Sequence, residues 1–145
     1  MSKLTIAILA LSLAGTAQAQ RPAPAPPSPQ ASLATGAGAD TVYFSSQGYG
    51  LTAQALGTLR ATAQWLRANP FATLRLEGHG DQGDTRDYAF AIGERRASEV
   101  RDFLITQGIP PERLAVATWG KERPGTMRIG TTVVGVGPRV VMIVR

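Results

Sequence analysis

Apolar residues with helical spacing alternate with short strand-like runs along residues 41–145. Two stretches, 51–69 and 85–107, repeat apolar residues every three or four positions, which is the spacing of an amphipathic helix. Four runs rich in β-branched or alternating apolar residues have the pattern of strands, and they are 41–44, 73–77, 114–118 and 140–144. The order β-α-β-α-β-β predicts the α/β class, a two-layer sandwich with the helices packed on one mixed sheet. Residues 120–138, rich in Gly and Thr, follow neither period, and no element is predicted there.

The N-terminus has the composition of an export signal. Lys3 precedes an apolar run at 4–14 and the small-residue tripeptide Ala17-Gln18-Ala19, which predicts a signal peptide spanning residues 1–19. The rival interpretation is a membrane anchor, but the apolar run is shorter than the roughly 18 to 20 residues that a span needs. We therefore expect an exported chain with no transmembrane segment after cleavage.

Residues 20–40 contain mostly Pro, Ala, Ser, Gln and Gly, with almost no bulky apolar side chain to bury. This composition predicts a disordered, Pro/Ala-rich linker that precedes a folded domain at 41–145. Two roles stay open for the linker, a spacer that gives the domain reach and a simple N-terminal tail. The chain has no cysteine, so hydrophobic burial without disulfides must support the fold, and no lipid can be attached at a cleavage-site cysteine.

The chain is basic, with a formal net charge of +5 and a pI near 10.4. Most arginines are scattered singly and do not form a run, as at Arg60, Arg67 and Arg75. Export also removes the protein from nucleic acid, so we expect no nucleic-acid partner. An anionic polymer of the cell envelope or a membrane face fits the charge better.

Two charged residues stand out around the second predicted helix. On a helical wheel, Arg96 falls near the middle of the apolar arc, where it must reach solvent, find a carboxylate or line a pocket. Asp81 lies in the loop that leads into this helix, just past the carboxyl end of a strand. Together they could hold a zwitterion, the arginine on a carboxylate and the aspartate on an ammonium. Alternatively, the two side chains pair with each other, or Asp81 caps the helix.

Catalytic residues are not apparent in the sequence. His79 is the only histidine, which rules out a multi-histidine metal site, and there is no cysteine nucleophile and no Gly-x-Ser-x-Gly elbow. We expect His79 to have a structural role at the strand end. The sequence therefore predicts a binding module that needs no metal or cofactor and is not an enzyme.

The segment Gly78-His79-Gly80-Asp81, followed by Tyr88 and then Gly93-Glu94-Arg95-Arg96-Ala97, resembles the signature of OmpA-like C-terminal domains. Within that family it is most similar to the peptidoglycan-associated lipoproteins, although this chain has no cysteine to carry the lipid. The similarity continues downstream in Trp119-Gly120-Lys121-Glu122-Arg123-Pro124 and covers roughly residues 41–145. The resemblance implies an OmpA-like fold.

The resemblance also implies a function and a site. The function is non-covalent binding of the diaminopimelate in the peptidoglycan stem peptide, which tethers or scaffolds the bacterial cell envelope from the periplasm, beside the outer membrane or cell wall. The implied contacts are Asp81 and Arg96, with Gly80, Gln82 and Arg139 as neighbours. Peptidoglycan is thus the expected partner, together with envelope or outer-membrane proteins.

Three departures from the family pattern keep a second hypothesis open. Ala89 replaces an asparagine, Gln47 stands where an acidic residue is usual, and an Asn-Arg-Arg sequence is reduced to Gly137-Pro138-Arg139. The alternative is a periplasmic protein-interaction domain with a degenerate, weakened peptidoglycan site.

Overall fold

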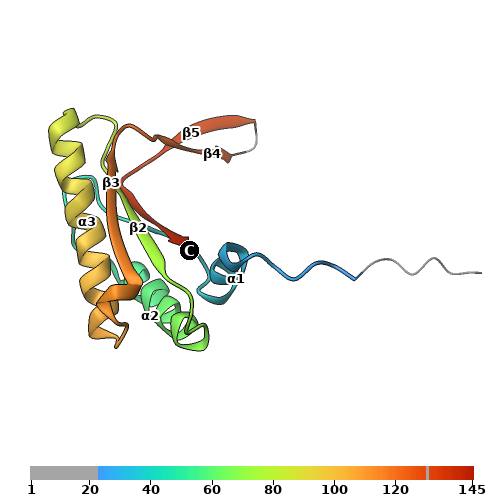
Figure 1. Cartoon of the computed structure of the whole chain (residues 1–145). Helices are drawn as coiled ribbons and strands as arrows, with labels where there is room; N and C mark the ends of the chain where they lie inside the picture. The colour runs from blue at the N-terminus through green and yellow to red at the C-terminus, as the bar shows by residue number, and fades with distance from the viewer. Residues whose placement is uncertain (1–22, 130) are drawn as a thin grey trace, which may run out of the picture.

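The computed structural model describes residues 23–129 and 131–145 (Figure 1). Its helices are α1 (Pro29–Gly36), α2 (Ala53–Ala68) and α3 (Arg86–Thr106), with a single 3₁₀ turn η1 (Pro111–Arg113). Its strands are β1 (Thr41–Tyr43), β2 (Leu74–His79), β3 (Leu114–Gly120), β4 (Gly125–Ile129), β5 (Thr132–Val136) and β6 (Arg139–Val144). The predicted signal peptide, residues 1–19, lies outside the described residues. None of the helices between residues 23 and 145 that the structure describes is long and apolar enough to cross a membrane.

Four strands form the main sheet in the order β1-β6-β2-β3. The neighbours β2 and β3 run parallel, while β6 runs antiparallel to both β1 and β2, so the sheet is mixed. Helix α3 connects the two parallel strands and lies along one face of the sheet (Figure 1). The predicted α/β two-layer architecture is confirmed, and the six predicted elements are found in the predicted order.

Both long helices begin at a threonine cap and bury one face. The hydroxyl of Thr52 accepts from the backbone N–H of Ala55 at 3.1 Å, and the hydroxyl of Thr85 accepts from that of Tyr88 at 3.3 Å. Gly108, just past α3, has a φ of +89°, the left-handed conformation that ends a helix at little cost when the residue is glycine. The two helices bury Leu59, Ala63, Leu66, Ala97, Val100 and Leu104 against sheet residues such as Leu74, Leu76 and Met142.

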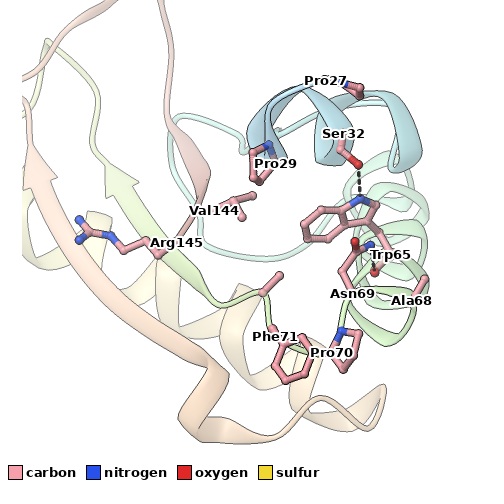
Figure 2. A pocket seen from close by; sticks show the side chains of 11 residues that line it. Pro27, Pro29, Ser32, Trp65, Ala68, Asn69, Pro70, Phe71, Val144 and Arg145 are labelled. Carbon is pink, nitrogen blue, oxygen red and sulfur yellow. Dashed lines mark hydrogen bonds between the residues drawn. The ribbon is translucent and has the colours of Figure 1, made fainter. Parts of the chain in front are cut away.

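The prediction of a disordered linker is wrong for residues 29–40. Residues 29–36 form α1, which Ser28 caps and which packs against α2 and β6. Leu33, the one bulky apolar residue of this stretch, is fully buried in the core. Figure 2 shows the indole N–H of Trp65 donating to the hydroxyl of Ser32, a bond of 3.0 Å. A single leucine and a few polar anchors therefore fold a segment whose composition indicates disorder.

Residues 120–138, for which no element is predicted, contain a hairpin of β4 and β5. These strands pair antiparallel with each other and form a separate two-stranded sheet. The hairpin projects from the body of the molecule, away from α3 (Figure 1). Its strands pair outside the main sheet, whose packing against the helices imposes the alternating pattern by which a strand is predicted.

Candidate functional site

The end of β2 and the first half of α3 are in direct backbone contact. A Cβ atom added to Gly78 would lie 1.8 Å from the carbonyl oxygen of Gly93. One added to Gly80 would lie 2.7 Å from the Cβ of Ala89, which is itself fully buried. Side chains at positions 78 and 80 would therefore push the helix away from the sheet. The small residues bring the β2–α3 loop down onto the helix that carries Arg96.

The β2–α3 loop folds into a tight turn between Asp81 and Asp84. The backbone N–H of Asp84 donates to the carbonyl oxygen of Asp81 at 3.2 Å, and the N–H of Asp81 donates to the Asp84 carboxylate at 3.1 Å. The Asp81 carboxylate accepts from the N–H of Gly83 at 3.2 Å through Oδ1. Its other oxygen, Oδ2, makes no hydrogen bond within the described part of the chain. Thr85, not Asp81, caps α3, so the capping alternative is wrong.

Arg96 is fully buried beneath this loop, on the apolar face of α3 where the helical wheel places it. Its guanidinium donates to the carbonyl oxygens of Gly48 at 2.8 Å, Ser45 at 3.1 Å, His79 at 3.2 Å and Ser46 at 3.4 Å. The Phe44 ring lies 5.7 Å from the guanidinium carbon. Among the described residues, no salt bridge joins Arg96 to Asp81, so the direct-pairing alternative is not found. Carbonyl oxygens from the loop 45–48 and from the end of β2 satisfy the buried cation instead.

Two opposing effects act on the pKa of Arg96. Burial lowers the pKa of the guanidinium from its usual value, because a charged group loses hydration in the protein interior. The carboxylate of Asp84, then Tyr88 and the carboxylate of Asp81, raise that pKa in decreasing order of effect. An arginine stays protonated under such conditions, so a buried positive charge lies beneath a loop with two carboxylates.

Gly80, Gln82 and Arg139 were also expected at the site. The structure places Gly80 and Gln82 in the β2–α3 loop. The N–H of Gly80 donates to the carbonyl oxygen of Gly120 at 2.9 Å, which ties the loop to the end of β3. The side-chain amide of Gln82 donates to the carbonyl oxygen of Lys121 at 3.2 Å. These two bonds fix the loop between α3 and β3.

Arg139 is not brought beside Arg96. It is the register partner of His79 on the face of the sheet that points away from α3, since Gly78, the residue before His79, faces the helix. Its guanidinium donates to the carbonyl oxygens of Arg123 at 3.2 Å, Gly137 at 3.4 Å and Val136 at 3.5 Å. Arg139 therefore holds the base of the β4–β5 hairpin.

His79 is buried beside Arg139, with 3% of its surface exposed. Burial, and secondarily the positive charge of Arg139, lower the pKa of His79 from 6.5 to about 4. Its Nδ1 atom has no hydrogen-bond partner within the described residues. A hydrogen bond to the Arg123 backbone acts in the opposite direction and raises the pKa, and the carbonyl oxygen of His79 accepts from Arg96.

Sequence reasoning missed three parts of the site. Asp84 follows Asp81 at the spacing of a turn, which is the signal that could have found it. Lys121 lies in the Trp-Gly-Lys-Glu-Arg-Pro segment and is the only lysine after residue 3. The loop 45–48 offered no signal, because its backbone carbonyl groups, not its side chains, contact Arg96.

Carboxylates and cations make up this arrangement, which suits it to contact with charged groups. Across residues 23–129 and 131–145, no group of three or more His, Cys, Asp or Glu side chains is placed to hold a metal ion. The loop instead presents a carboxylate oxygen of Asp81, with positive charge beside and beneath it. Fold and site together define a small α/β domain suited to binding a polar ligand that carries both charges.

Comparison with known proteins identifies the domain more closely. The sequence profile of the OmpA family matches residues 43–132. The chain therefore belongs to the OmpA family.

Two sequence relatives are peptidoglycan-associated lipoproteins. That of Agrobacterium fabrum is 41% identical over 85 residues, which are 59% of this chain and 48% of that protein. That of Haemophilus influenzae is 34% identical over 88 residues, which are 61% of this chain and 58% of that protein. The chain thus spans about half the length of the curated relatives that it matches.

Solved structures agree on the fold. The peptidoglycan-associated lipoprotein of Burkholderia pseudomallei superposes with a TM-score of 0.66 at 25% identity, over 74% of this chain and 92% of that one. The periplasmic domain of Helicobacter pylori MotB superposes with a TM-score of 0.57 at 16% identity, over 71% and 67% of the two chains. The second likeness shows the fold alone.

Proposed function

We propose that this chain binds peptidoglycan non-covalently in the periplasm, by recognising the diaminopimelate of the stem peptide. The observation that carries the proposal is the loop 81–84, whose carboxylates lie above the buried cation of Arg96. The names of its relatives, peptidoglycan-associated lipoproteins, support the same ligand class.

Diaminopimelate fits this distribution of charge. The end of its side chain carries an ammonium and a carboxylate on one carbon atom. The ammonium can donate to the carboxylate of Asp81. A carboxylate accepts several N–H bonds, and within the described part of the chain that of Asp81 accepts only one, at Oδ1.

The biological role that follows is attachment of an envelope component to the cell wall. In this proposal the domain is retained by its ligand or by envelope and outer-membrane proteins. Residues 23–28, which precede α1, would then serve as the spacer. The domain has no catalytic role in this proposal.

Sedimentation with purified sacculi tests the proposal. Residues 20–145 should sediment with sacculi, and Asp81→Asn should lose this property because the amide carries no charge for the ammonium. Asp102→Asn is the matched control, since that carboxylate is 69% exposed on α3 and makes only a 3.9 Å contact to the adjacent Arg101. Retention of the Asp81→Asn variant at the level of the control would refute the assignment of Asp81.

A second candidate function is a protein-interaction domain of the periplasm whose peptidoglycan site is weakened. The observation that favours it is the engagement of Arg96 by four carbonyl oxygens, which leaves little of the guanidinium for a ligand. This candidate predicts that residues 20–145 stay in the supernatant of the sacculus experiment, together with both variants.

A further inference from the structure

Strand β1 forms one edge of the main sheet, and its outer side has no partner strand among the described residues. The residues that flank it, Asp40 and Phe44, both form backbone hydrogen bonds towards β6, at 2.8 and 3.0 Å. Backbone groups of an antiparallel strand point alternately to its two sides, so those of Thr41 and Tyr43 point outward. Two N–H groups and two carbonyl groups therefore face the position of a further strand.

A groove of about 360 Å³ runs beside this edge, between β1 and the beginning of α2. Val42 and Phe44 line it from the strand, and Thr52, Ala55 and Thr58 line it from the helix and its cap. The side chain of Val42 points to the helix side of the sheet, where it is buried. Residues opposite each other on neighbouring strands point to the same face. An added strand would therefore direct the residue opposite Val42 into this groove.

Side chains cover parts of the other edge segments of the sheet. Next to β1, the edge of β6 is covered by Gln30 of α1, whose amide accepts from the N–H of Val144 and donates to the carbonyl oxygen of Met142, both at 2.9 Å. At the opposite edge, Arg101 of α3 donates to the carbonyl oxygen of Leu114, the first residue of β3, at 3.4 Å. Folded proteins commonly protect exposed edges from pairing by such means. Strand β1 has no cover of this kind within the described residues.

The surface around β1 also carries no formal charge. Residues 41–59 contain no Asp, Glu, Lys, Arg or His, although the chain has a net charge of +5. Charged side chains are the usual protection of an edge strand against its own copies. Two molecules can therefore bring their β1 edges together without placing like charges opposite each other. The edge of β3, by contrast, lies between Arg113 and Lys121, which opposes such pairing there.

We propose that β1 pairs antiparallel with β1 of a second copy and forms a two-fold symmetric dimer with one continuous sheet. With the two Val42 residues opposite each other, Thr41 of each copy faces Tyr43 of the other. Each of these two pairs exchanges two hydrogen bonds, so the dimer contains four. One short segment thus supplies both sides of the interface, as a two-fold axis requires. The pairing uses no residue of the loop 81–84 and is independent of the proposed function.

Proline at position 43 tests the backbone pairing. Tyr43→Pro removes an outward N–H and no bond to β6, so the fold should be kept, since proline is tolerated in an edge strand. Residues 20–145 should form a dimer with a Kd below about 1 mM in sedimentation equilibrium. Tyr43→Pro should raise this Kd at least about tenfold, because two of the four hydrogen bonds are lost.

Tyr43→Ala is the matched control, because it removes the half-exposed ring and keeps the N–H. It should raise the Kd by less than about fivefold. Phe71→Ser controls for a fully exposed aromatic side chain elsewhere and should leave the Kd unchanged. A chain that sediments as a monomer up to about 1 mM would overturn the proposal. So would a dimer that Tyr43→Pro and Tyr43→Ala weaken equally.

Hydrogen exchange of the native chain gives a readout that needs no variant. The backbone N–H groups of Thr41 and Tyr43 should exchange at least about tenfold more slowly in the dimer than in the monomer, whereas that of Val42, which already faces β6, should change little. The measurement is made by NMR at protein concentrations below and above the Kd. Exchange at Thr41 and Tyr43 that does not depend on concentration would mean that the copies do not pair through β1.

Discussion

Arg96 donates a hydrogen bond of 3.2 Å to the carbonyl oxygen of His79, across the boundary between α3 and the end of β2. The same guanidinium also bonds the carbonyl oxygens of Ser45 and Gly48 in the loop after β1. One buried side chain therefore ties the loop after β1 to the end of β2, two segments that are distant in sequence. Arg96 thus stabilises the fold, whereas an exposed ligand contact would not. A substitution at this position should therefore lower the free energy of unfolding.

Arg96→Ala should destabilise the fold as well as affect ligand binding. The substitution leaves a cavity and removes the donors of four carbonyl oxygens, so we expect the free energy of unfolding to fall by about 3 kcal/mol or more. Urea denaturation measures this change. Arg95→Ala should change it by less than about 0.5 kcal/mol, because the adjacent guanidinium is 59% exposed. Equal stability of the two variants would contradict the structural role of Arg96.

His79 should make the stability depend on pH. Its pKa is lowered from 6.5 to about 4 in the folded protein, so the unfolded chain binds the proton more readily between these values. The contribution of neutral His79 to the free energy of unfolding is therefore fully present above pH 6.5. It is lost as the pH decreases from 6.5 towards 4, by an amount on the order of a few kcal/mol. His79→Gln should remove most of this slope. Urea denaturation between pH 5 and 7.5 avoids the range in which exposed carboxylates titrate, and a variant with the native slope would contradict the prediction.

The backbone contact between β2 and α3 should tolerate no side chain at Gly78. A Cβ atom there would lie 1.8 Å from the carbonyl oxygen of Gly93, so Gly78→Ala should lower the free energy of unfolding by at least about 3 kcal/mol. Gly57→Ala is the matched control in α2, where an added Cβ meets no atom within 4 Å. That control should raise the free energy of unfolding by about 0.5–1 kcal/mol, as alanine favours a helix over glycine. Two variants of similar stability would show that the helix can move away from the sheet.

Helix α1 should contribute to the stability of the domain. Leu33→Ala removes a fully buried side chain and should lower the free energy of unfolding by about 3 kcal/mol. A chain that starts at residue 28 keeps the cap at Ser28 and should be as stable as residues 20–145. A chain that starts at residue 41 should lose as much stability as Leu33→Ala, or more. If the chain from residue 41 is fully stable, α1 is only an accessory segment.

The sequence predicted those parts of the fold that follow a simple period. The two long helices and the four strands of the main sheet carry regular apolar patterns and clear terminators, such as Asn69-Pro70 and Gly108. Helix α1 has a single buried leucine and so lacks a pattern to detect. The hairpin of β4 and β5 forms its own small sheet, where no alternation with the core is imposed.

The position of the candidate site was predictable from the sequence, but the hydrogen-bond partners of its side chains were not. The wheel placed Arg96 inside the apolar face of α3, and the structure buries it there. The partners of Arg96 are backbone carbonyl groups, which no residue pattern encodes. Arg139 lies on the opposite face of the sheet because its register with His79 depends on the order in which the strands pair. Lys121 comes to the loop through the parallel pairing of β2 and β3.

Competition on purified sacculi tests the central claim most directly. Residues 20–145 are mixed with sacculi, and the bound fraction is measured after sedimentation in the presence of diaminopimelate or, as a control, Nα-acetyl-lysine, which has an ammonium but no carbon atom that carries both an ammonium and a carboxylate. Recognition of diaminopimelate predicts that the protein sediments, that diaminopimelate releases it and that Nα-acetyl-lysine at the same concentration does not. A protein that stays in the supernatant, or that both amino acids release equally, would contradict the account.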